Sequence, residues 1–196
     1  NDASSSGNVA YGASLNYPND RWNAQFGATE VQENFTPEAG FVTRRAFRKY
    51  SPSLQFSPRP ANHRYIRQFT FGSSWDVRAD LRNDVVERNI NLTLFEVRLH
   101  SQDNISFRAN QQYVRLEEPF RITDDITLPL GATYTFSRYR VWAQTANRRM
   151  LAVNGSYEVG DFYSGTRTDR QVNLTVRART GVIVGVRGQW NSVELP

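Results

Sequence analysis

Two acidic pairs are the first residues of this chain whose types could support catalysis. Asp76 and Asp80 lie four residues apart, and Glu117 is followed directly by Glu118. Glycoside hydrolysis uses two carboxyl groups of this kind. Asp76 and Asp80, however, stand in a segment of alternating character beside Arg78, which favours ion pairs between neighbouring strands. We therefore expect these carboxylates to be structural.

The chain has only two histidines, His63 and His100. Either could act as a general base, but a hydrolytic triad also needs a nucleophile and an orienting group assembled in space, and no motif supplies them. Asp124 and Asp125 form a weak candidate for a cation site built from loop oxygens. The absence of cysteine excludes disulfides and thiolate metal sites. We expect no enzymatic activity, no cofactor and no resident metal.

A two-residue rhythm runs through the sequence and predicts the elements that carry these residues. Apolar residues alternate with polar ones between positions 69 and 81 and again between 172 and 190. Side chains of a strand alternate between faces, so each segment has an apolar face and a polar face. The predicted lipid-facing or core-facing residues are Phe69, Phe71, Trp75, Val77, Val172, Leu174, Val176, Val184, Val186 and Trp190. The predicted lumen or polar-face residues are Asp76, Arg78, Asp80, Arg177 and Arg179.

Alternation and turn residues together predict about ten long antiparallel strands. They cover residues 8–16, 21–32, 45–56, 65–81, 85–100, 104–116, 132–145, 150–163, 170–179 and 182–194. Within 85–100 the apolar phase switches, which predicts a β-bulge near Leu94 and Phe95. Within 132–145, Tyr134 and Phe136 are out of phase with Tyr139, which predicts a second bulge.

The domain organisation expected from this pattern is simple. Residues 1–7 read as a flexible tail, and residues 8–196 as one antiparallel β domain. Short turns alternate with longer loops, as in the up-and-down meander of bacterial membrane barrels. No apolar run approaches the length of a membrane helix. The chain opens without a signal peptide or an initiator Met, so we expect a processed protein or part of a larger one.

The charge of the chain is basic and comes almost entirely from arginine. The net charge is +5, and Lys49 is the only lysine. Arginine binds carboxylates and phosphates through two parallel hydrogen bonds, so its partners here are either acidic residues on neighbouring strands or anionic lipid headgroups. A genome that favours arginine codons is an equally simple source. The arginines are scattered along the strands, which argues against nucleic acid as a partner.

Aromatic residues gather near the predicted strand ends. In a membrane barrel they would form the girdles at the two interfaces. Ordinary cross-strand packing and an exposed sugar-binding platform are the alternatives. The residues are Tyr11, Tyr17, Trp22, Phe56, Tyr65, Tyr113, Phe162, Tyr163 and Trp190.

Four segments resemble the C-terminal β-barrel of large bacterial outer-membrane proteins of unknown function, in which a carbohydrate-binding family-9-like domain precedes the barrel. They are residues 30–42 (EVQENFTPEAGFV), 113–120 (YVRLEEPF), 134–139 (YTFSRY) and 160–166 (GDFYSGT). The resemblance implies an outer-membrane barrel without known enzymatic activity. The chain departs from the family in lacking the carbohydrate-binding domain, and ten strands would be only part of that barrel.

Three functions follow as hypotheses. The first is a bacterial outer-membrane β-barrel, or a large part of one, with a passive transport or structural role in contact with lipid bilayer or lipopolysaccharide. The second is a soluble or peripheral two-layer β-sandwich in the periplasm, an accessory subunit that binds other subunits of a membrane assembly through an arginine-rich face. The third is a carbohydrate-binding module.

Overall fold

The computed structural model describes residues 8–36, 44–121, 127–162 and 165–194, and within them the chain forms strands and their connections. This confirms the all-β prediction. Within the same residues no helix is both long and apolar enough to traverse a bilayer. The strands are β1 (Ala10–Pro18), β2 (Trp22–Val31), β3 (Phe47–Tyr50), β4 (Ser53–Phe56), β5 (Ile66–Asp80), β6 (Val85–Leu99), β7 (Asn104–Arg115), β8 (Phe120–Arg121), β9 (Thr127–Leu128), β10 (Thr133–Gln144), β11 (Leu151–Phe162), β12 (Gly165–Arg179) and β13 (Val182–Glu194).

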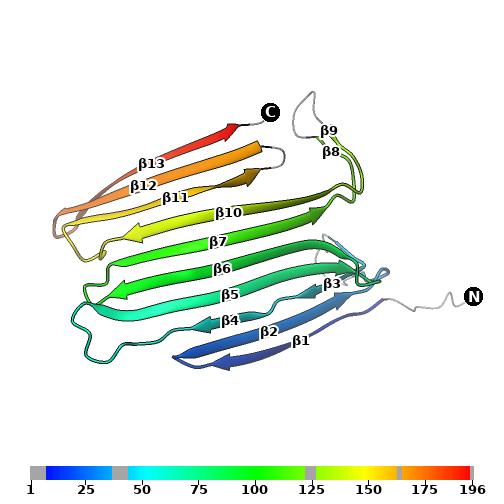
Figure 1. Ribbon diagram of the computed structural model, residues 1–196, viewed down its shortest axis with the longest axis horizontal. Helices are drawn as coiled ribbons and strands as arrows, with labels where there is room; N and C mark the ends of the chain where they lie inside the picture. The colour runs from blue at the N-terminus through cyan, green and yellow to red at the C-terminus, as the bar shows by residue number, and fades with distance from the viewer. Residues whose placement is uncertain (1–7, 37–43, 122–126, 163–164, 195–196) are drawn as a thin grey trace, which may run out of the picture.

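Eleven of these strands form one antiparallel meander sheet, in which neighbours along the chain are neighbours in space (Figure 1). The order is β1-β2-β3-β5-β6-β7-β10-β11-β12-β13, and β4 pairs with β2 and β5. β3 and β4 therefore share one position in the sheet, interrupted at Ser51 and Pro52. Proline has no N–H for the ladder, which explains the break. The sheet is open, with β1 and β13 at its two edges.

The connection between β7 and β10 contains a second sheet of two very short strands. Phe120 pairs with Leu128 and Arg121 pairs with Thr127, so β8 and β9 form a small hairpin. Figure 1 places this hairpin beyond the end of the large sheet. The predicted tail at residues 1–7 and the candidate cation pair Asp124 and Asp125 lie outside the described residues.

The bulge predicted near Leu94 is confirmed by the register. Thr93 pairs with Arg108 and Phe95 with Phe107, so two β6 residues separated by one position face two consecutive residues of β7. Leu94 is the extra residue that restores the apolar phase of the strand.

The second predicted bulge is wrong. β10 pairs with β7 in one register from Thr133 to Gln144, without a shift. Tyr134 and Phe136 therefore keep strict alternation and lie on the face opposite to Tyr139. The aromatic residues of β10 therefore lie on both faces of the sheet.

The sheet has almost no hydrophobic core within the described residues. The buried hydrophobic residues are Val31, Ala79, Val86, Ala146 and Ala152, all small or medium in size. Leu15 is 72% exposed, Val186 63% and Trp190 59%. The chain exposes 13589 Å², whereas a compact monomer of its mass would expose about 9,500 Å². Most of the large exposed side chains lie on one face, and the described residues place no second sheet over them.

Candidate functional site

The pairing of the strands defines an apolar face that crosses the sheet. Directly opposed residues share a face, so Val153, Leu174 and Val186 form one row across β11, β12 and β13. Farther along the sheet, Phe107 of β7 stacks on Tyr139 of β10 with ring centroids 6.5 Å apart. Alternation within the paired strands places on this face the residues predicted to face lipid or core: Phe69, Phe71, Trp75, Val77, Val172, Leu174, Val176, Val184, Val186 and Trp190.

Aromatic and basic side chains bound the apolar face at the end where β1 turns into β2. Trp22 stacks on Phe56, with ring centroids 4.3 Å apart, and the guanidinium of Arg21 lies 5.5 Å from the Phe56 ring. Tyr17 and Tyr65 are exposed at the same end. These contacts place a guanidinium group beside partly exposed aromatic rings.

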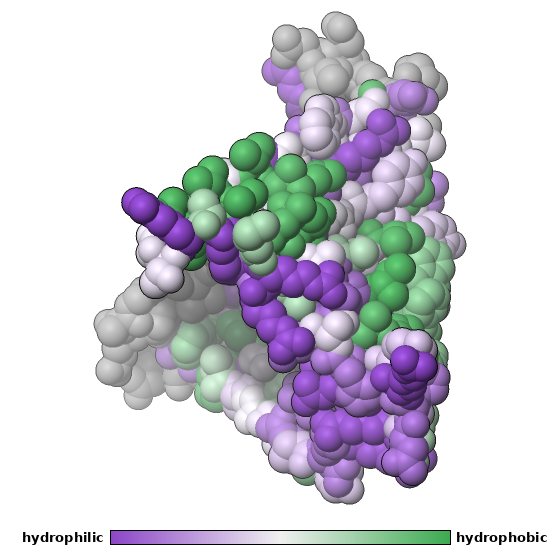
Figure 2. Space-filling view, turned by 90° about the vertical axis from the view of Figure 1, so that its left-hand side faces the viewer, coloured by the Kyte–Doolittle hydropathy of each residue, from purple (hydrophilic) through white to green (hydrophobic). Residues whose placement is uncertain are grey.

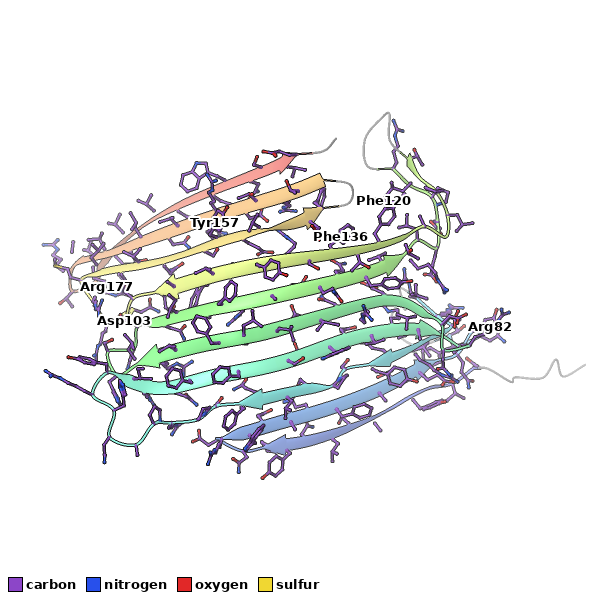
Figure 3. The ribbon with its side chains drawn as sticks, viewed as in Figure 1. Arg82, Asp103, Phe120, Phe136, Tyr157 and Arg177 are labelled. Atoms are coloured by element: carbon purple, nitrogen blue, oxygen red, sulfur yellow. The ribbon has the colours of Figure 1, made fainter. Side chains whose placement is uncertain are left out.

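Across the apolar face, the middle parts of β11, β12 and β13 have a similar composition. Arg170 lies 5.6 Å from the ring of Tyr157 and pairs with Trp190 across the strands. The ring of Trp190 covers Gly188, where an added Cβ would meet it at 2.5 Å. Tyr157 is one of the side chains labelled in Figure 3.

The other face of the sheet, the polar face, is hollowed. The hollow has a volume of about 670 Å³ and extends from β2 to β11. Its lining is dominated by amides and hydroxyls toward β2 and by charged groups toward β11. The polar residues that line it are Asn23, Gln25, Ser53, Gln55, Ser73, Ser74, Asn91, Thr93, Arg108, Asn110, Arg138, Arg140 and Glu158.

Asparagine side chains hydrogen-bond to one another across the strands of this face. The amide of Asn110 on β7 donates to the side-chain oxygen of Asn91 on β6 at 2.9 Å and to that of Asn89. Asn173 on β12 donates to Asn154 on β11 at 2.6 Å. These ladders satisfy amide groups between strands and leave the face neutral in its middle.

Arginines and carboxylates form a connected network on the same face, over β10, β11 and β12. Arg138 contacts Glu158 at 3.1 Å and also Asp169. Asp169 accepts a second guanidinium, that of Arg167, at 3.0 Å. Arg138, Glu158 and Asp169 are each about one-fifth exposed. A network that is partly withdrawn from water holds three strands more firmly than isolated surface pairs would.

The polar residues predicted from sequence lie outside the hollow. Asp76 pairs with Lys49 at 2.6 Å, Arg78 with Glu87 at 2.7 Å, and Asp80 with Arg115 at 3.4 Å. The first two ion pairs lie on the polar face, and the third joins the ends of β5 and β7 near the turn from β5 to β6. The two aspartates contact different cations and are not arranged as a catalytic pair.

Arg177 and Arg179 lie at the turn from β12 to β13. The guanidinium of Arg177 reaches the backbone oxygen of Arg149 at 3.5 Å. A register shift separates the two arginines, so that Arg177 pairs with Ile183 but Arg179 pairs with Val182. Because consecutive residues of β13 face opposite sides, the shift takes Arg179 out of phase with Arg177.

The structure brings the two histidines together without giving them a catalytic arrangement. The Nδ1 atom of His63 accepts the backbone N–H groups of Tyr65 and Ile66, at 3.2 and 2.9 Å. The Nε2 atom of His100 lies 3.1 Å from the backbone oxygen of His63. Both rings therefore form hydrogen bonds with the backbone at the start of β5. Among the described residues, no group of His, Asp and Glu has the geometry of a metal site.

Sequence reasoning missed the residues that line the hollow, Asn91, Asn110, Arg138 and Glu158 among them. All four occupy polar positions in alternating segments, and this is the only feature of the sequence that could have identified them. Which polar residues meet, however, depends on the register between strands.

Comparisons of the chain with protein-family models, with curated proteins and with solved structures find no match. The resemblance to the outer-membrane family stays a prediction.

Proposed function

We propose that this chain forms part of the wall of a bacterial outer-membrane β-barrel, with a passive transport or structural role and no catalysis. The apolar face lies against lipid hydrocarbon, and the polar face with its hollow lines a wet interior. The observation that carries this proposal is an extended apolar face that the described residues leave uncovered.

The exposed apolar face supports a contact with lipid because the exposure of apolar surface to water is unfavourable in free energy. Soluble monomers rarely expose contiguous apolar patches beyond a few hundred Å². Here large exposed residues occur on nearly every strand, from Leu15 on β1 through Phe71 and Val141 to Val186 on β13. Membrane barrels have such an outer surface, together with a polar interior.

The lengths of the strands also support a sheet that crosses a bilayer. A tilted strand needs about 9 to 11 residues to cross a bilayer. β5, β6 and β12 have 15 residues each, and β7, β10 and β11 have 12 each. Such strands are longer than most strands of soluble sheets.

Closure is a requirement of this proposal. Hydrocarbon does not tolerate unpaired backbone groups, so the outer edges of β1 and β13 must be paired by other strands when the sheet lies in a membrane. The turns at the end of the sheet that includes β12–β13 are mostly short, and the connection from β7 to β10 at the other end is long. Bacterial barrels have this asymmetry between their two ends.

A pair of adjacent substitutions on β12 tests the proposal. Val176→Arg places a charge on the apolar face, and Thr175→Arg places the same charge on the polar face. In lipid, a charge on the apolar face costs about 2 to 4 kcal/mol at the bilayer midplane and about 1 kcal/mol or less near an interface. Val176 lies three residues before the end of β12, so we expect a cost of about 1 to 2 kcal/mol, whereas the lumen side tolerates Thr175→Arg. Assembly is measured as the fraction of protein that stays with vesicles after a carbonate wash. Val77→Arg repeats the measurement on β5.

Equal assembly of Val176→Arg and Thr175→Arg would contradict a lipid-facing apolar surface. A chain that leaves the vesicles in carbonate, and stays soluble without detergent, would instead favour the periplasmic accessory subunit, with the apolar face covered by protein. The carbohydrate-binding module stays a prediction that rests on the aromatic residues alone.

A further inference from the structure

The two ends of the large sheet differ in charge. The meander brings the connections 19–21, 57–65, 100–103, 145–150 and 180–181 to one end, which is on the left in Figure 1. We call these connections, with three residues on either side of each, the cationic end. Its charged residues are two aspartates, Asp20 and Asp103, and nine arginines, Arg21, Arg59, Arg64, Arg67, Arg98, Arg148, Arg149, Arg177 and Arg179.

The opposite end is balanced. Its described connections, taken with the same three flanking residues and the outer ends of β1 and β13, hold nine basic and nine acidic residues. Figure 3 shows the separation, with Asp103 and Arg177 at one end and Arg82 and Phe120 at the other. The excess of positive charge is thus a property of one end rather than of the whole chain.

Internal ion pairs use few of the arginines at the cationic end. Asp20 pairs with Arg59 and Asp103 with Arg149, each at 2.6 Å, so both aspartates are already engaged. Arg98 reaches Glu96 at 3.5 Å. The other six form no ion pair with a carboxylate of the described residues, and five of them are exposed: Arg21, Arg64, Arg67, Arg148 and Arg179. They are available to an anionic partner.

The side chains beside these arginines are aromatic and aliphatic. Arg64 lies 5.2 Å from the ring of Tyr65, which is 60% exposed. Met150 is 71% exposed and Ile183 64%. In Figure 2 a hydrophobic surface reaches this end of the molecule, with hydrophilic residues below it. Arginine next to aromatic and aliphatic groups suits the boundary between lipid headgroups and acyl chains. The phosphate backbone of a nucleic acid would leave these exposed aliphatic side chains without an apolar partner.

We propose that the cationic end binds the phosphate groups of anionic lipids at one surface of the bilayer. The inference deepens the proposed function and rests on it, because it names the lipid class and the end of the sheet that meets it. Guanidinium groups bind phosphate through paired hydrogen bonds. Each basic residue near an anionic surface strengthens binding by about fivefold.

Fluorescence quenching in vesicles tests the proposal. Trp75, Trp142 and Trp190 are replaced by Phe, which leaves Trp22 at the cationic end as the reporter. Quenching by brominated phosphatidylglycerol is compared with quenching by brominated phosphatidylcholine. We expect a preference for phosphatidylglycerol that falls when salt rises from about 0.1 M to about 1 M, since the Debye length shrinks from about 10 Å to about 3 Å.

Two triple variants with equal loss of charge give the matched control. Replacement of Arg64, Arg148 and Arg179 by Gln should reduce the preference by up to about 100-fold. Replacement of Arg44, Arg45 and Arg82 by Gln, at the opposite end, should leave it within about twofold. Equal losses in the two variants, or no preference in the parent protein, would overturn the proposal. Displacement of phosphatidylglycerol by a short DNA duplex at equal phosphate concentration would overturn it in favour of nucleic acid.

Brominated phosphatidylcholine separates this inference from the function on which it rests. If Trp22 is quenched in neutral vesicles but shows no preference for the anionic lipid, the sheet is inserted and only the headgroup inference fails. If neither lipid quenches Trp22, the membrane proposal itself fails.

Discussion

The two faces of the sheet are built from the same strands but held together in different ways. On the polar face, specific partners meet: Asn110 with Asn91, and Arg138 with Glu158 and Asp169. On the apolar face, rows of aliphatic and aromatic side chains touch only their immediate neighbours and leave their outer surface exposed. The polar face is therefore largely satisfied within the chain. The apolar face is left exposed by the described residues, which is why the proposed function rests on that face.

Moving the register by one residue should give the largest effect, because it exchanges the two faces. Deletion of Gln171, near the middle of β12, turns about half of that strand over. Deletion of Leu94 should be tolerated, since Thr93 and Phe95 already pair with the consecutive residues Arg108 and Phe107. We expect the first deletion to abolish assembly in vesicles and the second to retain it, measured by resistance to a carbonate wash. Retention of both variants would mean that the faces are not distinguished by their surroundings.

Removing the centre of the arginine–carboxylate network should have a smaller effect. Arg138→Met takes the shared partner away from Glu158 and Asp169, which are each 21% exposed. The expected loss is about 1 to 2 kcal/mol, between the values for surface and buried pairs. The measurement is the urea midpoint of unfolding from vesicles.

Arg140→Met is the matched control on the same strand. Its side chain is 45% exposed, donates to the Ser156 hydroxyl at 3.1 Å and lies 3.8 Å from Glu158, so its loss should shift the midpoint little. If Arg140→Met is as damaging as Arg138→Met, partial burial of the network is not what stabilises the polar face.

The turn from β6 to β7 should make the stability of the fold depend slightly on pH. Asp103 accepts hydrogen bonds from the Ser101 hydroxyl, the Ala146 backbone N–H and Arg149, and these hold the pKa of its carboxyl below the ordinary value. A lowered pKa stabilises the fold above the unfolded-state pKa of about 3.9, and this contribution is lost as pH falls through the lower folded-state value.

Asp103→Asn should therefore unfold more easily at pH 7 and show less further weakening on acidification than the parent protein. Urea unfolding across this pH range measures both effects. Asp20→Asn, whose side chain is 67% exposed in its pair with Arg59, should change stability less at pH 7. An unchanged acid response in Asp103→Asn would show that these hydrogen bonds do not persist in solution.

The sequence predicted the strands and their faces well because alternation is a local property. The predicted strand at 182–194 has the bounds of β13, and the bulge at Leu94 followed from a change of phase that the residues themselves display. The same reasoning failed at Tyr134 and Phe136, because an aromatic residue can lie on either face when neighbouring strands leave room for it. The prediction of a strand at 170–179 missed the start of β12 at Gly165, where threonine and charged residues hide the alternation.

The hollow could not have been predicted in the same way. Its residues come from β2 to β11, and their meeting depends on six inter-strand registers and on the curvature of the sheet. Asp76, Arg78 and Asp80 occupy alternate positions of one predicted strand, so the sequence alone identifies them as polar-face residues. Asn91 and Asn110 became a pair only when β6 and β7 were aligned.

The most direct test of the central idea compares two tryptophans on opposite faces of the sheet, Trp75 near its middle and Trp142 toward the cationic end. Trp75 belongs to the apolar face, and Trp142 pairs with Ser106 on the polar face. In vesicles, a variant with Trp75 as its only tryptophan should be quenched by phosphatidylcholine brominated on its acyl chains and protected from aqueous iodide. A variant with only Trp142 should show the reverse. Equal access of iodide to both tryptophans would contradict a sheet with hydrocarbon on one side and water on the other.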